Sequence, residues 1–365
     1  MFLIITEIYL FLFRTHVIIG VATLGLVVCE KTELRETTQD RYLPQPVDTV
    51  KVTDNYYMDG YSACTATALG EGRTLNAANL FLDGAELYVA NFAGKCVDVF
   101  DAESLKYKRS MANGERTLAR DVYVEGDHVF VAAGDSREVQ IFDRKTGAYL
   151  SRLGTGNWQG SNVSWAGCVC ATKRFAFVRD SKETNVRVFD REALDLKAAN
   201  NNTVFARLAT GGNFIGGRDE PTTESYDMEV IGDSLYAFVP RTGVVYAWNV
   251  NEIADKKDKT PVSVTTPGGV KIRSVARGKD DATLFVAMQK NGNTLLAEMT
   301  VADFQSRNFG ASLRQFAADS RVTLPSQPII AYVNERLVMT NGDKLERWEI
   351  RNNPSYIIQP KKIQP

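Results

Sequence analysis

The segment LYVANFAGKCVDVFD, residues 87–101, places two short apolar runs on either side of a polar connection. The runs, residues 87–90 and 97–100, have the length and the composition of paired strands. The connection is short enough for a tight turn between antiparallel strands. The segment therefore predicts a β-hairpin.

The same hairpin pattern returns five times along the chain. The first strands of the six copies begin at residues 87, 129, 175, 235, 284 and 337, with a mean interval of 50 residues. A period near 50, with two visible strands and room for two more, is typical of a four-stranded propeller blade. The returning segments are VFVAAGDSREVQIFD (129–143), FAFVRDSKETNVRVFD (175–190), LYAFVPRTGVVYAWNV (235–250), LFVAMQKNGNTLLAEMT (284–300) and LVMTNGDKLERWEI (337–350).

A further strand precedes several of these hairpins. Residues 79–90, 121–132 and 227–239 share an apolar alternation, a glycine turn and the next strand. The turn glycines are Gly84, Gly126 and Gly232, and a two-residue hairpin turn needs the positive φ angle that glycine adopts without penalty. A fourth strand is weaker in the sequence, although residues 146–156 and 204–208 fit it.

These repeats predict an all-β, six-bladed β-propeller of four-stranded blades over residues 47–350. A ring lets blades that cannot bury both faces alone cover one another. Residues 47–57 or 355–359 can supply the missing strand of the last blade, and we favour the N-terminal segment. The long interval over residues 191–226 leaves a seven-bladed ring as the alternative to an inserted loop.

The repeats resemble β-propellers of the NHL and YVTN type, and especially the secreted propeller lipoproteins of Bacteroidetes. The resemblance spans roughly residues 47–350 and is carried by the segments LYVAN, VFVAAG, VDVFD, VQIFD and VRVFD. These segments specify a fold better than a ligand. The resemblance implies a binding protein or a scaffold, and in some members an enzyme.

Composition excludes one class of partner. The chain has 43 Lys and Arg against 44 Asp and Glu, so its formal charge of −1 gives no electrostatic reason to expect nucleic acid. With 44% hydrophobic and 24% charged residues, it can fill a core. We expect a folded monomer.

The N-terminus has a different composition from the rest. Residues 1–28 are nearly all apolar, and the stretch 17–28 has the length of a signal-peptide core. Cys29 and a polar segment follow, as in a bacterial lipoprotein signal in which the cysteine carries the lipid. Val28 departs from that pattern, which has a small residue before the cysteine. Another cleaved signal and an uncleaved membrane anchor are the alternatives.

All three interpretations export the folded part. The chain is predicted to have a leader (1–28), a flexible linker (29–46), the propeller (47–350) and a C-terminal tail (351–365). We expect a periplasmic, outer-membrane or cell-surface lipoprotein that meets the membrane only through its N-terminal anchor.

Candidate ligand-binding residues lie where the innermost strands begin, because propeller loops converge at one end of the axis. This polar ring could hydrogen-bond a sugar, and its arginines could grip a carboxylate in a bidentate manner. Alternatively, it only satisfies strand ends around a water-filled channel. The strand-start positions are Asn79, Asp121, Asp227 and Ser274, preceded in three cases by Arg120, Tyr226 and Arg273.

Two loops offer further candidates. Residues 216–230 contain Asp219, Glu220, Glu224, Asp227 and Glu229, whose oxygens suit calcium. The spacing is not that of a calcium loop, and we favour a solvated insertion. No metal ligand set and no cofactor is therefore assigned, with calcium kept as an option.

The second loop, GTGNWQGSNVSW (154–165), exposes Trp158 among glycines and amides, which suits stacking on a sugar face. A hydrophobic plug between blades is the alternative. Trp248 and Trp348 lie in predicted strands and are expected in the core.

Enzymatic chemistry has few candidates. The chain has two histidines, His16 in the leader and His128 in a turn where we expect it exposed, so no Ser-His-Asp set can be built. Cys168 and Cys170 share a strand face, and we expect them to pack in the core rather than to bind metal.

The sequence thus favours binding over catalysis. We expect an exported propeller that binds a polar small molecule, a glycan or an envelope protein at one end of its axis. The alternatives are a cation-dependent lactonase or polysaccharide lyase and a structural scaffold of an envelope assembly.

Overall fold

The structure is a computed structural model, and it describes most of the chain between residues 51 and 352. These residues belong to one compact unit, residues 47–352, whereas residues 1–46 and 353–365 lie outside the described residues. The predictions for the leader and the linker therefore remain predictions. The described ranges are 51–64, 75–156, 160–180, 185–209, 227–254, 261–266, 269–278, 280, 282–307, 314–318, 324–326 and 328–352.

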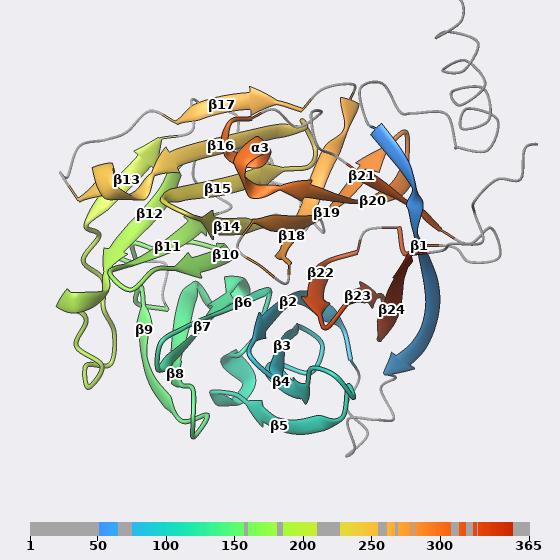
Figure 1. The fold of residues 1–365 in the computed structure, drawn as a ribbon. Helices are drawn as coiled ribbons and strands as arrows, with labels where there is room; N and C mark the ends of the chain where they lie inside the picture. The colour runs from blue at the N-terminus through green and yellow to red at the C-terminus, as the bar shows by residue number, and fades with distance from the viewer. Residues whose placement is uncertain are drawn as a thin grey trace, which may run out of the picture. The chain divides into compact units, whose positions relative to one another are not determined.

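The described residues form six four-stranded antiparallel blades arranged around an axis, as the repeats predicted (Figure 1). From the axis outward, blades one to three are β2 (Ala77–Asp83), β3 (Glu86–Asn91), β4 (Cys96–Asp101) and β5 (Tyr107–Met111); β6 (Asp121–Glu125), β7 (His128–Ala133), β8 (Glu138–Asp143) and β9 (Tyr149–Leu153); and β10 (Ala166–Ala171), β11 (Phe175–Asp180), β12 (Asn185–Asp190) and β13 (Ala206–Ala209).

The second half of the ring repeats this order. Blades four to six are β14 (Met228–Ile231), β15 (Ser234–Val239), β16 (Val244–Asn249) and β17 (Val262–Thr265); β18 (Lys271–Arg277), β19 (Thr283–Lys290), β20 (Asn293–Thr300) and β21 (Arg314–Ala318); and β22 (Ile330–Val333), β23 (Arg336–Asn341), β24 (Lys344–Asn352) and β1 (Lys51–Cys64). Two short helices, α2 (Val250–Ile253) and α3 (Val301–Gln305), follow β16 and β20.

The ring closes through its N-terminal strand. β1 pairs antiparallel with β24, from Tyr56 opposite Asn352 to Cys64 opposite Leu345, and so supplies the outermost strand of blade six. It also pairs in parallel with β21, which joins blades five and six into one eight-stranded sheet. The N-terminal alternative for closure is confirmed, and the strand runs seven residues beyond the predicted end at residue 57.

The apolar residues of the repeats fill the spaces between blades. β3 and β11 are buried along almost their whole length because a neighbouring blade covers each face, whereas the outermost strand β13 alternates buried and exposed residues. Leu87 and Val89 of blade one pack in one cluster with Val338 and Leu345 of blade six. Fully burying such a side chain stabilises the fold by about 1.5–3 kcal/mol. The first and last blades are therefore held by a core contact as well as by β1.

Two recurrent residue types set the turns. Gly84, Gly126 and Gly232 have φ angles of 58°, 64° and 59°, as the hairpin turns require. The last residue of the VDVFD and VQIFD segments closes the turn to the fourth strand, since Asp101 Oδ1 accepts from Ser104 N at 2.8 Å and Asp143 Oδ1 accepts from Thr146 N at 2.7 Å. The repeated aspartate is a turn residue rather than a ligand residue.

Trp248, Trp348, Cys168 and Cys170 are buried, as expected, and both cysteines are free thiols. His128 is half-buried rather than exposed, since its ring lies against Arg191 and Phe130. Among the described residues, no helix has the length and apolar composition needed to cross a membrane.

Candidate functional site

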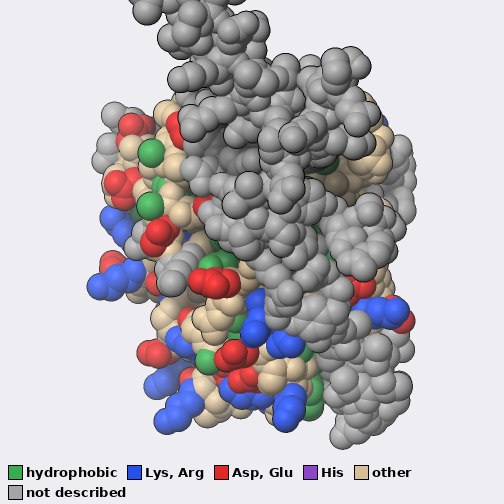
Figure 2. Space-filling view, turned by 45° about the vertical axis from the view of Figure 1, so that its right-hand side comes forward, with side chains coloured by type: hydrophobic (Ala, Val, Ile, Leu, Met, Phe, Trp, Pro, Cys, Tyr) green, Lys and Arg blue, Asp and Glu red, His purple; other side chains and the backbone are tan. Residues whose placement is uncertain are grey.

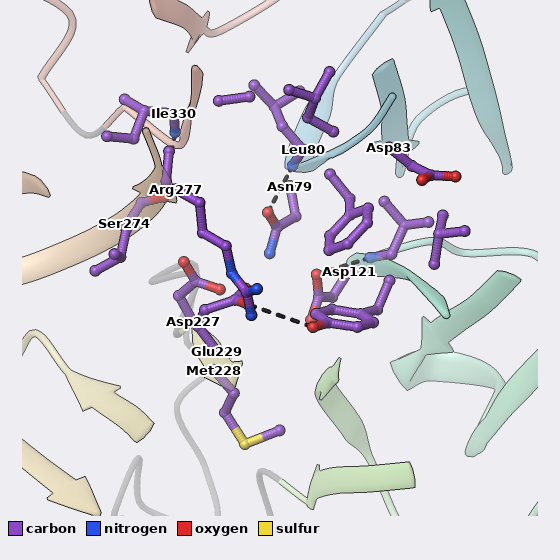
Figure 3. Close-up of a pocket in the computed structure, with 18 of the residues that line it drawn as sticks. Asn79, Leu80, Asp83, Asp121, Asp227, Met228, Glu229, Ser274, Arg277 and Ile330 are labelled. Carbon is purple, nitrogen blue, oxygen red and sulfur yellow. Dashed lines mark hydrogen bonds and ion pairs between the residues drawn. The ribbon is translucent and has the colours of Figure 1, made fainter. Parts of the chain in front are cut away.

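The six innermost strands surround a cavity of about 290 Å³ on the axis of the ring, here called the axial cavity. Each of β2, β6, β10, β14, β18 and β22 contributes at least one lining residue. Figure 3 shows the side chains of Asn79, Asp121 and Asp227, which come from three blades, around the same space. The axial cavity thus collects residues that lie far apart in the sequence.

The four strand-start positions all line the axial cavity. Asn79, Asp121 and Ser274 share one register, since each lies opposite an alanine of the second strand of its blade. Asp227 directly precedes β14, and its carbonyl accepts a hydrogen bond from Phe238 N at 3.0 Å. All four residues are at most 9% exposed. The structure brings these four residues together at one cavity, and ligand binding by the group stays a prediction.

Asp121 is fixed by backbone donors from two blades. Its Oδ1 accepts from Val122 N at 2.7 Å, and its Oδ2 accepts from Val169 N in β10 at 2.7 Å. Asn79 has the equivalent of the first contact, since its Oδ1 accepts a hydrogen bond from Leu80 N at 2.6 Å. In both strands, the backbone N–H of the following residue therefore orients the polar side chain.

Asp227 repeats the arrangement one interface further on. Its carboxylate accepts hydrogen bonds from Met228 N, from Val275 N and from the Ser274 hydroxyl of β18. Ser274 Oγ in turn accepts from Ile330 N of β22 at 3.2 Å. These bonds link neighbouring blades, so part of the polar ring has the structural role that was the alternative to ligand binding.

Burial and mutual repulsion shift the ionisation of these carboxyls. Desolvation, reinforced by the Glu229 charge, raises the pKa of Asp227 to about 7. Burial and the nearby Asp227 raise the pKa of Asp121 well above its usual range. Hydrogen bonds from Val169 and Val122 oppose the shift of Asp121 without cancelling it.

Three further residues line the axial cavity: Phe81 and Tyr123, which were not predicted as site residues, and Glu229, which was predicted only as part of a loop. Glu229 accepts hydrogen bonds through Oε1 from the Tyr123 hydroxyl at 3.3 Å and from Arg277 Nη2 at 3.2 Å. Burial raises the pKa of Glu229, and Arg277 opposes that rise. Glu229 was assigned to a loop that could bind calcium, but it lies in β14 and faces the axial cavity.

An aromatic pair forms another part of the wall. The rings of Phe81 and Tyr123 have centroids 4.3 Å apart, and both residues line the axial cavity. Phe81, Tyr123 and Glu229 each follow a strand-start residue by two positions. Because alternate residues of a strand share a face, this spacing is the sequence signal that could have found them.

The two predicted arginines lie outside the lining of the axial cavity. Arg120 Nη2 donates to Asp135 Oδ2 at 3.3 Å, and its guanidinium lies 4.6 Å from the ring centroid of Phe92. Arg273 is buried, and its Nη2 donates to Gln289 Oε1 at 2.8 Å. To grip a ligand carboxylate, either side chain would have to exchange these contacts.

Several other candidates cannot be placed. Trp158 and Tyr226 lie outside the described residues, as do Asp219, Glu220 and Glu224. Among the residues that are described, no group of three or more His, Cys, Asp or Glu is arranged to hold a metal ion.

A second cavity, of about 530 Å³, lies between turns of blades one and six and is also lined by Gly278 of blade five. Its acidic residues are engaged locally, since Asp101 Oδ1 accepts from the Ser104 hydroxyl at 2.6 Å and Glu103 Oε1 accepts from Arg336 at 3.4 Å. Figure 2 shows one face of the protein, on which the described Lys and Arg side chains lie interspersed with Asp and Glu. The axial cavity is therefore the stronger candidate.

Comparison with known proteins gives no family. No protein-family model matches the chain, and no curated protein matches it. Solved structures with similar folds include Kuenenia stuttgartiensis hydrazine synthase, at 16% identity and a TM-score of 0.48, covering 73% of this chain and 74% of that chain. The Myceliophteria thermophila Cps50 (Swd1) β-propeller domain has 9% identity and a TM-score of 0.48, covering 80% of this chain and 99% of that chain.

A third solved structure, U3-55K, has 12% identity and a TM-score of 0.44, covering 73% of this chain and 78% of that chain. The propeller fold of this chain follows from its own strand order. No family model matches that would assign it to an NHL-like or lipoprotein family. The function of this chain therefore has to be argued from its own site.

Proposed function

We propose that this propeller binds a small polar ligand in the axial cavity, with Asn79, Asp121 and Asp227 among its contacts. The observation that carries the proposal is the convergence of buried polar groups from separate blades on one cavity of about 290 Å³. Small-molecule sites are typically concave, with a few fixed polar groups among apolar ones. Met228, Val275 and the Phe81–Tyr123 pair supply the apolar part.

The fixed geometry of the polar groups supports binding. Asp121 and Asp227 are held by backbone N–H groups that belong to strands, so they lose little freedom when a ligand arrives. A ligand that satisfies the remaining lone pairs gains the full value of hydrogen bonds in a desolvated site. Preorganised acceptors of this kind favour recognition of a ligand that donates hydrogen bonds.

The proposal includes the cellular setting predicted from the N-terminus. We propose that the chain is exported and anchored through Cys29, and that it meets its ligand at the cell envelope. A glycan fragment or a free sugar fits this setting. Cation-dependent lactone or polysaccharide cleavage and an envelope scaffold are the competing functions, and the experiment below separates them from binding.

The test is a thermal-shift screen of the full-length chain, purified in mild detergent, against neutral sugars, polyols, uronic acids, amines and divalent cations. A ligand of the native state raises the melting temperature, by RT ln(1 + [L]/Kd) in free energy. Any hit is repeated on Asn79→Ala, with Asn200→Ala as the matched control because Asn200 is exposed. We expect the shift to be reduced in the first variant and kept in the second.

Two results would overturn this function. A shift that survives in Asn79→Ala and in Asp121→Asn would place the ligand elsewhere. Silence across the whole screen, together with co-purification of a stable protein partner, would favour the scaffold. Turnover of a lactone or a uronic-acid polymer that depends on an added divalent cation would favour the enzyme.

A further inference from the structure

The axial cavity contains more negative than positive groups. Asp121, Asp227 and Glu229 line it, and Arg277 is the cation among the described residues that contacts one of them. Arg277 reaches Glu229 rather than either aspartate, and its side chain is 52% exposed. The two aspartates are bonded to neutral donors. Among the described residues, therefore, no cation contacts Asp121 or Asp227.

The described cations near the three carboxyls have other partners than the two aspartates, since Arg277 is bonded to Glu229 and Arg179 interacts with Cys168. The titratable groups that interact with the three carboxyls are Tyr123 on β6, Cys168 and Cys170 on β10, and Arg277 on β18. Behind them, Glu125 on β6 interacts with Tyr123, and Arg179 on β11 interacts with Cys168. Burial raises the pKa of both thiols and of Tyr123, so these groups stay neutral at physiological pH. Among these groups, the carboxyls therefore mainly affect one another, because the negative charge of one raises the pKa of the next.

We infer that the axial cavity selects a small organic ligand that carries a protonated amine, with Asp121, Asp227 and Glu229 as its negative partners; this inference rests on the proposed function. An ammonium group has three N–H donors in a compact positive charge. Placed among the carboxyls, it removes their mutual repulsion and makes charge-assisted hydrogen bonds, which are about twice as strong as neutral ones. A neutral sugar can donate hydrogen bonds to the carboxyls, but these bonds are weaker and do not offset the negative charges.

Two further features of the lining fit an ammonium ligand. Phe81 and Tyr123 present an aromatic pair in the same wall, and the faces of aromatic rings attract cations. Asn79 is 3% exposed and its Oδ1 is taken by Leu80 N, whereas its Nδ2 has no hydrogen-bond partner among the described residues. That amide donor calls for an oxygen acceptor on the ligand. The class indicated is an amine that also carries a hydroxyl group.

The geometry favours an organic ammonium over a metal ion. The part of the chain that is described offers no group of three or more His, Cys, Asp or Glu placed to hold a metal. The carboxylate oxygens also retain short backbone contacts, which a metal ion would compete with. An ammonium group can bridge separate acceptors without requiring them to form one coordination shell.

The test uses serinol, which is glycerol with its central hydroxyl group replaced by an amine, and glycerol itself. Isothermal titration calorimetry on the full-length chain at pH 7 should give a Kd for serinol at least about tenfold lower than that for glycerol. Titrations in two buffers of different ionisation enthalpy should show protons released on binding, because the carboxyls ionise as the ammonium arrives. Calcium chloride is titrated as the metal probe.

Variants test whether the preference for serinol over glycerol arises in the axial cavity. Glu229→Gln keeps an acceptor for Tyr123 and Arg277 but removes one charge, so the serinol preference should fall to within about threefold. Glu192→Gln, at an exposed site, should keep the preference. If Glu229→Gln does not fold, Phe81→Leu serves as the second variant, and it should weaken serinol binding more than glycerol binding.

The outcomes separate this inference from the proposed function. If glycerol or another neutral ligand binds in the cavity and serinol binds no better, the ammonium inference is wrong while the binding function stands. If calcium binds tightly and serinol does not, the inference is wrong as well. If no probe binds here and the broader screen is silent, both fail. Serinol preference that is lost in Glu229→Gln and kept in Glu192→Gln supports the inference.

Discussion

The Oδ2 atom of Asp121 accepts a 2.7 Å hydrogen bond from the backbone N–H of Val169, and this bond joins the innermost strands of two neighbouring blades. The two residues are 48 positions apart in the sequence. The same side chain lines the axial cavity. One carboxyl therefore serves both the closure of the ring and the polarity of the candidate site, and substitutions there should affect stability as well as binding.

Replacement of Asp121 by alanine should lower the free energy of unfolding by about 2–4 kcal/mol at pH 6. Two buried N–H groups, those of Val122 and Val169, lose their acceptor, and each unsatisfied buried group costs about 1–3 kcal/mol. Urea denaturation followed by circular dichroism measures the loss. Asp127→Ala, in the exposed turn after β6, should change stability by less than about 0.5 kcal/mol. Equal effects of the two variants would contradict the inter-blade role.

Stability should fall as the pH rises from about 4 to about 7. Asp227 ionises near 3.8 in the unfolded chain, whereas burial and Glu229 raise its pKa to about 7 in the folded chain. Between these values the folded state holds a proton that the unfolded state has lost, so each pH unit lowers the free energy of unfolding by up to about 1.4 kcal/mol. The raised pKa values of Asp121 and Glu229 act in the same direction.

Urea midpoints of the native protein and of Asp227→Asn at pH 5 and pH 7.5 check this dependence. The variant removes the carboxyl whose pKa is raised to about 7, so its midpoint should change less between the two pH values. A native protein that is more stable at pH 7.5 than at pH 5 would show that these carboxyls do not control the pH dependence.

Deletion of residues 1–64 should abolish cooperative unfolding, while deletion of residues 1–46 should leave the melting temperature within a few degrees. The longer deletion removes β1 and exposes the edges of β24 and β21, both of which pair with it. Differential scanning calorimetry compares the two proteins. If both unfold alike, the core contacts between blades one and six suffice to close the ring, and β1 is dispensable.

Substitution of Cys29 by serine tests the predicted anchor. In a bacterial host that lipidates proteins, the native chain should incorporate labelled palmitate and sediment with the membrane fraction, and the Cys29→Ser protein should do neither. Cys96→Ser, at a buried core position, is the control for general loss of the protein. Membrane association that persists without label in Cys29→Ser would favour the uncleaved anchor instead.

The repeats allowed much of the fold to be predicted because local rules control it. Each hairpin of the six copies forms a strand pair in the structure, and the turn glycines have the positive φ angles inferred for them. The closing strand was also predicted, although its end at Cys64 was not, since strand length depends on the partner strand β24. Inter-blade cores follow from the same alternation of apolar residues.

The site was predicted only in part. Register alone placed Asn79, Asp121, Asp227 and Ser274 together, because equivalent positions in a symmetric ring meet at one level of the axis. Arg120 and Arg273 precede two of these positions, yet they turn away to Asp135 and Gln289. Adjacent strand residues point to opposite faces, so a neighbour in sequence need not be a neighbour in the cavity.

By itself, the sequence determined that similar small sheets repeat about every 50 residues and need one another to hide their apolar faces, because strand periodicity and turn chemistry are local properties. Only the tertiary structure decided which polar groups are buried together. Glu229 approaches Tyr123 across 106 residues, and Asp121 repels Asp227 across a ring that no local pattern encodes. Ionisation in the axial cavity depends on those distances and on the exclusion of water, and both arise when the ring closes.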